Sequence, residues 1–204
     1  MKQQSSNLKW VVIGLVVVLL AGGSMVSTYN KLVSLDQGVQ AQWAQVENVY
    51  QRRADLIPNL VQTVKGAAAF EKETFLAVTE ARARVGQVSP EALKNAASNP
   101  ESLQQFQQAQ DQLTGALSKL MVVVEKYPDL KATANFRDLQ VQLEGTENRI
   151  SVERMRFNES AQAFNTQRAS FPTSVFAGFF GAKFQEKAYF TAAVGANVAP
   201  TVAF

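Results

Sequence analysis

Cysteine and histidine are both missing from the 204 residues of this chain. The lack of cysteine excludes disulfide bonds, thiolate zinc sites and cysteine nucleophiles. The lack of histidine removes the commonest general base and the commonest transition-metal ligand. A di-metal site in a helical bundle uses Glu-x-x-His pairs, which this chain cannot form. We therefore interpret the scattered acids Asp138, Glu144, Glu147 and Glu153 as solvated side chains, and we expect neither a metal nor a cofactor.

The chain also lacks the motifs of common enzyme classes and a concentration of positive charge. No G-x-x-x-x-G-K-[ST] phosphate loop, G-x-S-x-G nucleophile elbow or G-x-G-x-x-G turn occurs in it. Of the 20 Lys and Arg residues, Lys2 and Lys9 precede an apolar segment, and the remaining 18 stand against 17 Asp and Glu. Binding nucleic acid requires a basic stripe, which is absent. We expect no enzyme activity, no nucleic-acid partner and no small-molecule substrate.

An uncharged segment runs from Trp10 to Val26. A helix needs about 20 apolar residues to cross the roughly 30 Å hydrocarbon core of a bilayer, and Trp10 and Tyr29 bracket the run as interfacial aromatic residues do. A cleaved signal peptide is the alternative, but no Ala-x-Ala cleavage site follows. We predict a short N-terminal segment at 1–9 and a transmembrane helix at 10–28. The residues expected to contact the lipid bilayer include Trp10, Leu15, Leu20 and Val26.

Basic residues around this segment indicate its orientation. Lys2 and Lys9 precede it, whereas only Lys31 follows it closely. Because cytoplasmic loops carry an excess of Lys and Arg, this pattern favours an N-terminus inside the cell. We predict a single-pass protein of the inner (cytoplasmic) membrane, with the rest of the chain on the periplasmic or extracellular side.

Residues 29–171 have the apolar periodicity of helices. From Leu35 to Ala68, apolar residues recur in steps of three and four, which places them on one helix face. Pro58 lies within this pattern, and a proline inside a helix removes one hydrogen bond, so we predict a kink near Leu56. A second helix is predicted from about Glu71 to Val85, a third after the start signals Ser89-Pro90-Glu91 and Asn99-Pro100-Glu101, and a fourth from near Asn135.

The last of these helices carries a large apolar residue at every seventh position. These residues are Phe136, Leu143, Ile150, Phe157, Phe164 and Phe171. Such a repeat predicts a long helix packed lengthwise on its neighbours. Amphipathic helices joined by short turns predict an all-α fold, in which the transmembrane helix is followed by an elongated antiparallel four-helix bundle.

The segment 172–204 forms an aromatic-rich C-terminal tail with little charge. A tail this apolar is not simply solvated. It can fold back on its own bundle, rest on the membrane surface or pack against another subunit. Because 188–204 is uncharged, self-association is attractive there, and we expect a homo-oligomer. The candidate self-association residues are Phe176, Phe179, Phe180, Phe184, Tyr189 and Phe190.

Charged residues gather just before Pro58, where Arg52, Arg53 and Asp55 follow one another closely. One interpretation is a site where a partner docks at a kink. The other is an ion-pair cluster that holds the first helix of the bundle to the last, through Glu147. Structural charge networks outnumber docking sites, so we favour the second interpretation.

Three sequence blocks resemble the LemA family, and together they span roughly residues 29 to 190. The first is Tyr29-Asn30, Leu32-Val33, the run from Arg52 to Val61 and Val64-Lys65-Gly66; the second is the run from Tyr127 to Ala132, Asn135-Phe136, Leu139-Gln140 and Thr146-Glu147; the third is Phe164-Asn165, Phe171-Pro172 and Phe179-Phe180-Gly181. The chain departs from the family pattern at Phe157-Asn158 and Phe164-Asn165, where tyrosine-asparagine pairs are common, and in its apolar extension after Phe190.

The resemblance implies a short membrane segment, an antiparallel helical bundle and no established catalytic activity. Members often accompany membrane proteases or other envelope proteins, which implies a scaffold or an adaptor. The leading hypothesis is therefore a non-enzymatic, membrane-anchored scaffold that self-assembles through its bundle and apolar tail in the cell envelope. The alternative is an adaptor that presents substrates to a membrane protease or another envelope protein.

Overall fold

The computed structural model describes residues 2–67, 72–178 and 180–191, and within these ranges it contains helices and no strand. This confirms the predicted all-α class. The helices are α1 (Lys2–Ala67), α2 (Lys72–Gln87), α3 (Pro90–Asn95), α4 (Pro100–Val124), α5 (Pro128–Lys131), α6 (Ala134–Ala169) and α7 (Thr173–Ala177), followed by the 3-10 turn η1 (Gly181–Phe184).

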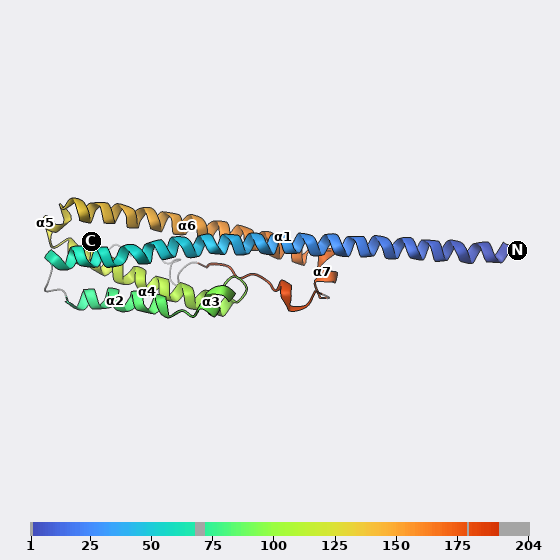
Figure 1. The fold of residues 1–204 in the computed structure, drawn as a ribbon, viewed down its shortest axis with the longest axis horizontal. Coiled ribbons are helices and arrows are strands. Elements are labelled where there is room, and N and C mark those ends of the chain that lie inside the picture. Colours follow the sequence, from blue (N-terminus) through green and yellow to red (C-terminus); the bar gives the residue numbers. More distant parts are fainter. Residues whose placement is uncertain (1, 68–71, 179, 192–204) are drawn as a thin grey trace, which may run out of the picture.

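Helix α1 is a single helix of 66 residues that joins the apolar segment to the rest of the molecule (Figure 1). At 1.5 Å per residue it is about 99 Å long. It is the one helix in the described ranges that is long and apolar enough to cross a membrane, and only 6% of its most apolar window is buried in the molecule. Leu15 and Leu20 are exposed, as lipid-facing side chains would be.

Pro58 lies inside α1, and the helix continues for nine residues beyond it. Proline has no backbone N–H, so it leaves the carbonyl of residue 54 without its usual helical donor. Here Nε of Arg82, on α2, donates a hydrogen bond of 3.2 Å to the Ala54 carbonyl. The neighbouring helix thus supplies the donor that proline removes, which explains how α1 continues through this position.

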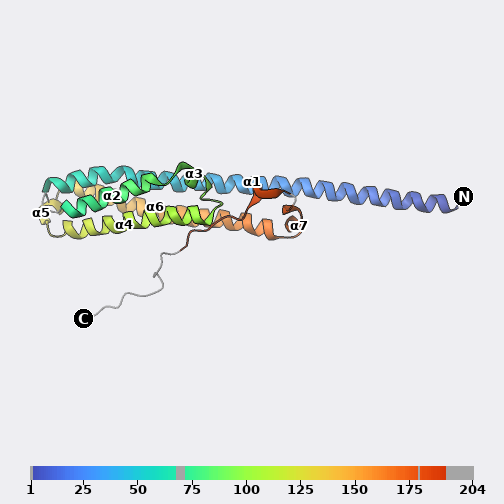
Figure 2. The same ribbon diagram turned by 90° about the horizontal axis from the view of Figure 1, so that it is seen from below.

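The long helices lie side by side in two close pairs, α6 along α1 and α2 along α4 (Figures 1 and 2). Helix α6 has 36 residues, whereas α2 has only 16. Helices α2 and α4 therefore accompany only part of the α1–α6 pair, and the end nearer the apolar segment is covered by α7 and the chain that follows it.

Local sequence signals set the helix boundaries. The side chain of Ser89 accepts a hydrogen bond from the Ala92 N–H at the start of α3, and that of Asn99 accepts from the Glu101 and Ser102 N–H groups at the start of α4. Both caps were predicted from their Ser/Asn-Pro-Glu sequences, because these side chains satisfy N–H groups that have no helical partner. Thr133 caps α6 in the same way through the Phe136 N–H.

The heptad residues of α6 are buried from Phe136 to Phe164, as predicted. The repeat fails at its last member, because the side chain of Phe171 is 84% exposed. Helix α6 ends at Ala169, and Phe171 stands in the turn before Pro172, where the helical register no longer directs it inward. Proline disfavours a helical conformation at the residue before it.

Candidate interaction site

Arg53 is the most constrained charged residue of the cluster predicted before Pro58. Its side chain projects from α1 into the interior and is 1% exposed. One guanidinium nitrogen, Nη1, donates to Glu147 Oε1 on α6 at 2.7 Å and to Thr114 Oγ1 on α4 at 3.0 Å. The other, Nη2, donates to the side-chain oxygen of Gln110 on α4. One residue of α1 therefore holds both α4 and α6.

Tyr50 lies one turn before Arg53, and the guanidinium carbon of Arg53 stands 5.2 Å from the centre of its ring. A cation over an aromatic face is stabilised by the ring's quadrupole. Burial raises the pKa of the Tyr50 hydroxyl above 10.0, against the opposing influence of Arg154 and Arg53. Tyr50 is therefore a neutral platform under Arg53 at physiological pH.

The other residues of the predicted cluster lie apart from this network. Arg52 and Asp55 are exposed, and Asp55 accepts a hydrogen bond of 2.8 Å from Gln51 on its own helix. Pro58 is partly buried. The structure thus brings Arg53 and Glu147 together as the ion-pair interpretation requires. Sequence reasoning missed Gln110 and Thr114 as further partners, although Gln110 is a polar residue within an apolar stripe of the sequence.

A groove of about 530 Å³ opens between α4 and α6, beside Arg53. We call it the α4/α6 groove. Its apolar residues are Leu60, Leu117, Met121 and Leu143, and its polar residues are Thr114, Ser118, Gln140, Glu144, Glu147 and Asn148. The Glu147 side chain, which binds Arg53, remains 43% exposed toward solvent. An apolar floor with polar walls suits a peptide segment better than a charged small molecule.

The chain from Gln185 to Thr191 follows η1 without helical structure and lies against α6, and we call it the C-terminal strap. Two asparagines of α6 hold its backbone. Asn165 accepts from the Lys187 N–H at 2.8 Å and donates to the Lys187 carbonyl at 2.9 Å. Asn158 accepts from the Phe190 N–H at 2.9 Å and donates to the Phe190 carbonyl at 3.0 Å. Each asparagine thereby satisfies both backbone groups of one strap residue, as a neighbouring strand would.

Lys187 adds a buried ion pair that the sequence did not indicate. Its side chain is 3% exposed, and Nζ lies 2.5 Å from Asp36 Oδ1 on α1. The same ammonium group donates to Ser98 Oγ at 3.0 Å and stands 4.8 Å from the centre of the Phe164 ring. The strap is therefore tied to α1, to α6 and to the turn between α3 and α4.

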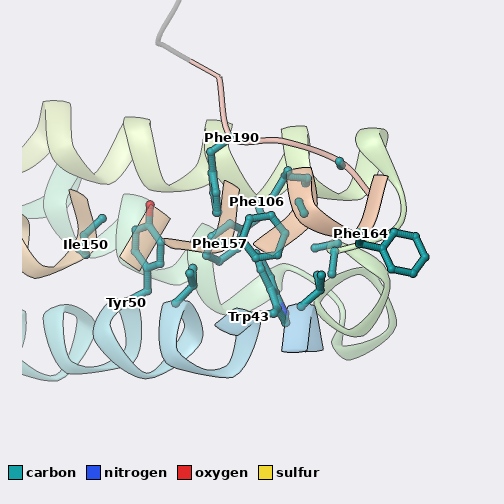
Figure 3. Close-up of a cluster of buried hydrophobic side chains, with 14 of the residues drawn as sticks. Trp43, Tyr50, Phe106, Ile150, Phe157, Phe164 and Phe190 are labelled. Carbon is teal, nitrogen blue, oxygen red and sulfur yellow. The ribbon is translucent and has the colours of Figure 1, made fainter. Parts of the chain in front are cut away.

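Aromatic side chains seal the strap onto the core (Figure 3). Phe190 points inward from the strap toward Trp43 of α1, and their rings stack with centroids 6.0 Å apart. Phe157 of α6 meets the edge of Phe190 at 5.4 Å, and Phe106 of α4 meets Trp43 at 5.4 Å. Four segments of the chain thus contribute one ring each to a single cluster, which gives the strap a large apolar contact.

The structure places the six candidate self-association residues differently from one another. Phe184 and Phe190 are buried in the core of their own chain, Phe180 packs against that core, Phe176 is partly buried, and Tyr189 is 40% exposed. Phe179 lies outside the described residues. For Phe184 and Phe190, this is the fold-back alternative. Self-association through the tail remains a prediction.

The carboxyl group of Glu47, beside Trp43 and Tyr50, is the second group whose pKa is shifted. Burial raises the pKa of its carboxyl above 4.5, and the nearby Trp43 indole offsets this only in part. Because the folded-state pKa is raised, ionised Glu47 costs stability above that pKa and costs nothing below 4.5, where folded and unfolded states are both protonated.

We expect Glu47→Gln to raise the melting temperature at pH 7 and to leave it unchanged near pH 3.5. Melting curves of wild type, Glu47→Gln and the exposed control Glu159→Gln at both pH values test this, and a lower melting temperature for Glu47→Gln at pH 7 would refute it.

Across the described ranges no group of three or more Asp and Glu side chains is placed to hold a metal ion. The buried polar groups instead join helices to one another and to the strap. The fold and site thus define a class: an all-helical protein with one apolar N-terminal helix and polar networks that hold it together.

Comparison with known proteins specifies the family. The LemA family model matches residues 42–204, so the chain belongs to the LemA family. It is 25% identical to the magnetosome proteins MamQ 1 and MamQ 2 of Paramagnetospirillum magneticum, over 87% of this chain and 72% of theirs. It is 26% identical to the magnetosome protein MamQ of Magnetospirillum gryphiswaldense, over 78% of this chain and 64% of that protein.

Proposed function

We propose that the protein is a non-enzymatic, membrane-anchored scaffold whose copies associate side by side in the membrane. The observation that carries this proposal is the unbroken α1, which runs from the apolar segment into the core at Trp43 and Arg53. A continuous helix transmits the direction of its membrane segment to the rest of the molecule. Copies in one membrane would therefore stand parallel, each with about 58 Å of α1 beyond residue 28.

An exposed row of residues on α6 offers a surface for such association. It consists of Val141, Gly145, Asn148, Val152 and Met155, which follow one another in steps of four and three and are all exposed. We call it the outer stripe of α6. Steps of four and three are the spacing of a coiled-coil seam. Val141 and Met155 are 67% and 54% exposed, so the stripe presents apolar side chains outward at both of its ends.

Charges beside the outer stripe favour a second copy of this chain as its occupant. Glu144 directly precedes the seam residue Gly145, and Arg149 directly follows the seam residue Asn148, so the two charges flank the seam on opposite sides. In a parallel coiled coil, a residue placed like Glu144 faces the residue five positions later on the partner helix. Glu144 of each copy would then meet Arg149 of the other, whereas an in-register antiparallel pair would bring Glu144 against Glu144. Charge complementarity and the shared membrane thus favour the same parallel arrangement.

The absence of native cysteine makes this proposal testable by disulfide cross-linking of the full-length protein in membranes. Met155→Cys should form covalent dimers under mild oxidation, because the two copies of residue 155 would face each other across a parallel seam. Ala41→Cys is the matched control, since Ala41 is exposed on α1 at about the same height, next to Gln42, which bonds to Glu153 of α6. Equal and slow cross-linking of both variants would contradict self-assembly through the outer stripe.

The location we propose is the inner membrane, with the helical rod on the periplasmic or extracellular side. Lys2 and Lys9 before the apolar segment, against Lys31 after it, support this orientation. Membership of the LemA family and similarity to the magnetosome proteins MamQ support a membrane-associated, non-catalytic role. Protease accessibility would test the side of the membrane. The helical rod should be protected in intact cells and cleaved once the outer layer of the cell envelope is permeabilised.

A second candidate is an adaptor for another envelope protein, and one observation favours it. Phe171 and Val175 are 84% and 56% exposed, and α7, which carries Val175, packs against α1. Helix α7 lies toward the end of the bundle that is nearer the apolar segment (Figure 1), and the apolar side chains exposed there are available to a partner. An adaptor would yield a stable hetero-complex when native membranes are cross-linked, without the Met155→Cys dimer.

A further inference from the structure

The C-terminal strap ends two helical turns before the α4/α6 groove, on the helices that line it. The carbonyl of Thr191, the last described residue, accepts hydrogen bonds from Gln107 on α4 at 3.1 Å and from Arg154 on α6 at 2.9 Å. Gln107 stands seven residues, or two turns, before Thr114 on α4, and Arg154 stands seven residues beyond Glu147 on α6. Thr114 and Glu147 both line the groove. Residues seven apart share a helix face, so the strap and the groove occupy the same side of the α4–α6 pair.

The strap also follows α6 in a fixed register. Asn165 holds residue 187 and Asn158 holds residue 190, so seven residues of helix match three residues of extended chain. The lengths agree, because seven helical residues rise about 10.5 Å and three extended residues about 10 Å. Continued past Thr191 at the same ratio, the chain would reach Ser151 with residue 193 and Glu144, in the groove, with residue 196.

We propose that residues 192–199 of the same chain occupy the α4/α6 groove and continue the strap beyond Thr191. Their sequence, Ala-Ala-Val-Gly-Ala-Asn-Val-Ala, has no charge and no side chain larger than valine or asparagine. The groove offers apolar contact at Leu117 and Leu143 and hydrogen-bonding side chains along its walls, which suits a small-residue segment with an extended backbone. Attachment at Thr191 supplies a high effective concentration of this occupant.

This assignment gives the uncharged tail a specific role. Where it lies in the groove, it covers the exposed part of Glu147 and so shields the ion pair with Arg53. Shielding from water strengthens an ion pair that is already held by hydrogen bonds. The α4/α6 groove is then a receptor for an extended, uncharged peptide, and the chain's own tail fills it. Asn148 belongs both to this groove and to the outer stripe of α6, and Glu144 also lines the groove, so a tail in the groove and a second copy on the stripe would compete for these two residues. The test of the tail reads a disulfide within one chain and is therefore separate from the test of the stripe.

A pair of introduced cysteines tests the proposal in the full-length protein. Ser118 lies on the groove wall eleven residues along α4 from Gln107, or about 16.5 Å, which five extended residues cover from Thr191. Ser118→Cys combined with Ala196→Cys should form an intrachain disulfide. The matched control is Lys119→Cys with Ala196→Cys, because Lys119 is exposed at the same height of α4 but points about 100° away from Ser118.

The expected result is rapid intrachain disulfide formation for the 118–196 pair and little for the 119–196 pair, read as a faster-migrating monomer and mapped by mass spectrometry of the digest. Equal rates for the two pairs, or no disulfide in either, would overturn the proposal. A disulfide between chains for the 118–196 pair would overturn it as well, because the groove would then receive the tail of a second copy.

Discussion

Arg53→Ala should lower the free energy of unfolding by about 3–5 kcal/mol, the range observed when one partner is removed from a buried charge network. The change leaves the buried side chain of Gln110 without its donor and opens a cavity over the Tyr50 ring. Glu147 is 43% exposed in its side chain and can regain water, so it contributes less to this cost. Glu147→Gln should therefore be milder, at about 1–3 kcal/mol, because Arg53 keeps Thr114 and Gln110.

Arg52→Ala is the matched control, since Arg52 is the preceding residue and is exposed. An exposed substitution of this kind should change stability by no more than about 0.5 kcal/mol. Denaturant titration of the full-length proteins in mild detergent, followed by helical circular dichroism, measures all three variants. If Arg53→Ala unfolds at the same denaturant midpoint as the wild type, the cluster does not hold the helices together, and the partner-docking interpretation would then be favoured.

Periodicity in the sequence predicted most of the helical core for a simple physical reason. A helix that packs on one face must repeat apolar residues at that face, so Phe157 and Phe164 could be assigned to the interior from spacing alone. The caps at Ser89 and Asn99 were equally predictable, because their hydrogen bonds run to residues two or three positions away. Information of this kind is local in the chain.

The continuity of α1 could not be read from the same patterns. The apolar segment and the first amphipathic helix differ in what surrounds them, lipid in one case and protein in the other, and this difference suggested separate segments at 10–28 and 29 onward. The backbone has no reason to break there, because no proline lies between Trp10 and Pro58. At Pro58 itself, the compensating Arg82 lies 24 residues away on α2, where no local pattern indicates it.

The strap was missed because its partners are far away in the sequence. Lys187 is one of three charged residues in an otherwise apolar tail, and its counterion Asp36 lies 151 residues earlier. One signal was nevertheless present. Asn158 and Asn165 repeat with the heptad and directly follow buried phenylalanines, so they sit at the edge of the core, where a polar side chain needs a partner. In this protein the partner of each asparagine is the backbone of the strap.

The strap's aromatic contact leads to the second large effect. Phe190→Ala should detach the strap from the core, because truncation of a buried phenylalanine typically costs about 3–5 kcal/mol and the strap has little structure of its own. Trp43, which stacks on Phe190 and is 3% exposed, should then become accessible to water. The chain has two tryptophans, so in a Trp10→Phe background the fluorescence reports Trp43 alone. We expect a red-shifted emission and stronger quenching by acrylamide.

Two comparisons make this result specific to the strap. Phe171→Ala is the same substitution at a side chain that is 84% exposed, and it should leave Trp43 fluorescence unchanged. Asn158→Ala removes both backbone hydrogen bonds at residue 190 without touching the aromatic cluster, and it should shift the emission in the same direction as Phe190→Ala by a smaller amount. If Trp43 stays shielded in Phe190→Ala while the helices remain folded, α4 and α6 close over it without the strap. The strap would then lie on a core that excludes water without it.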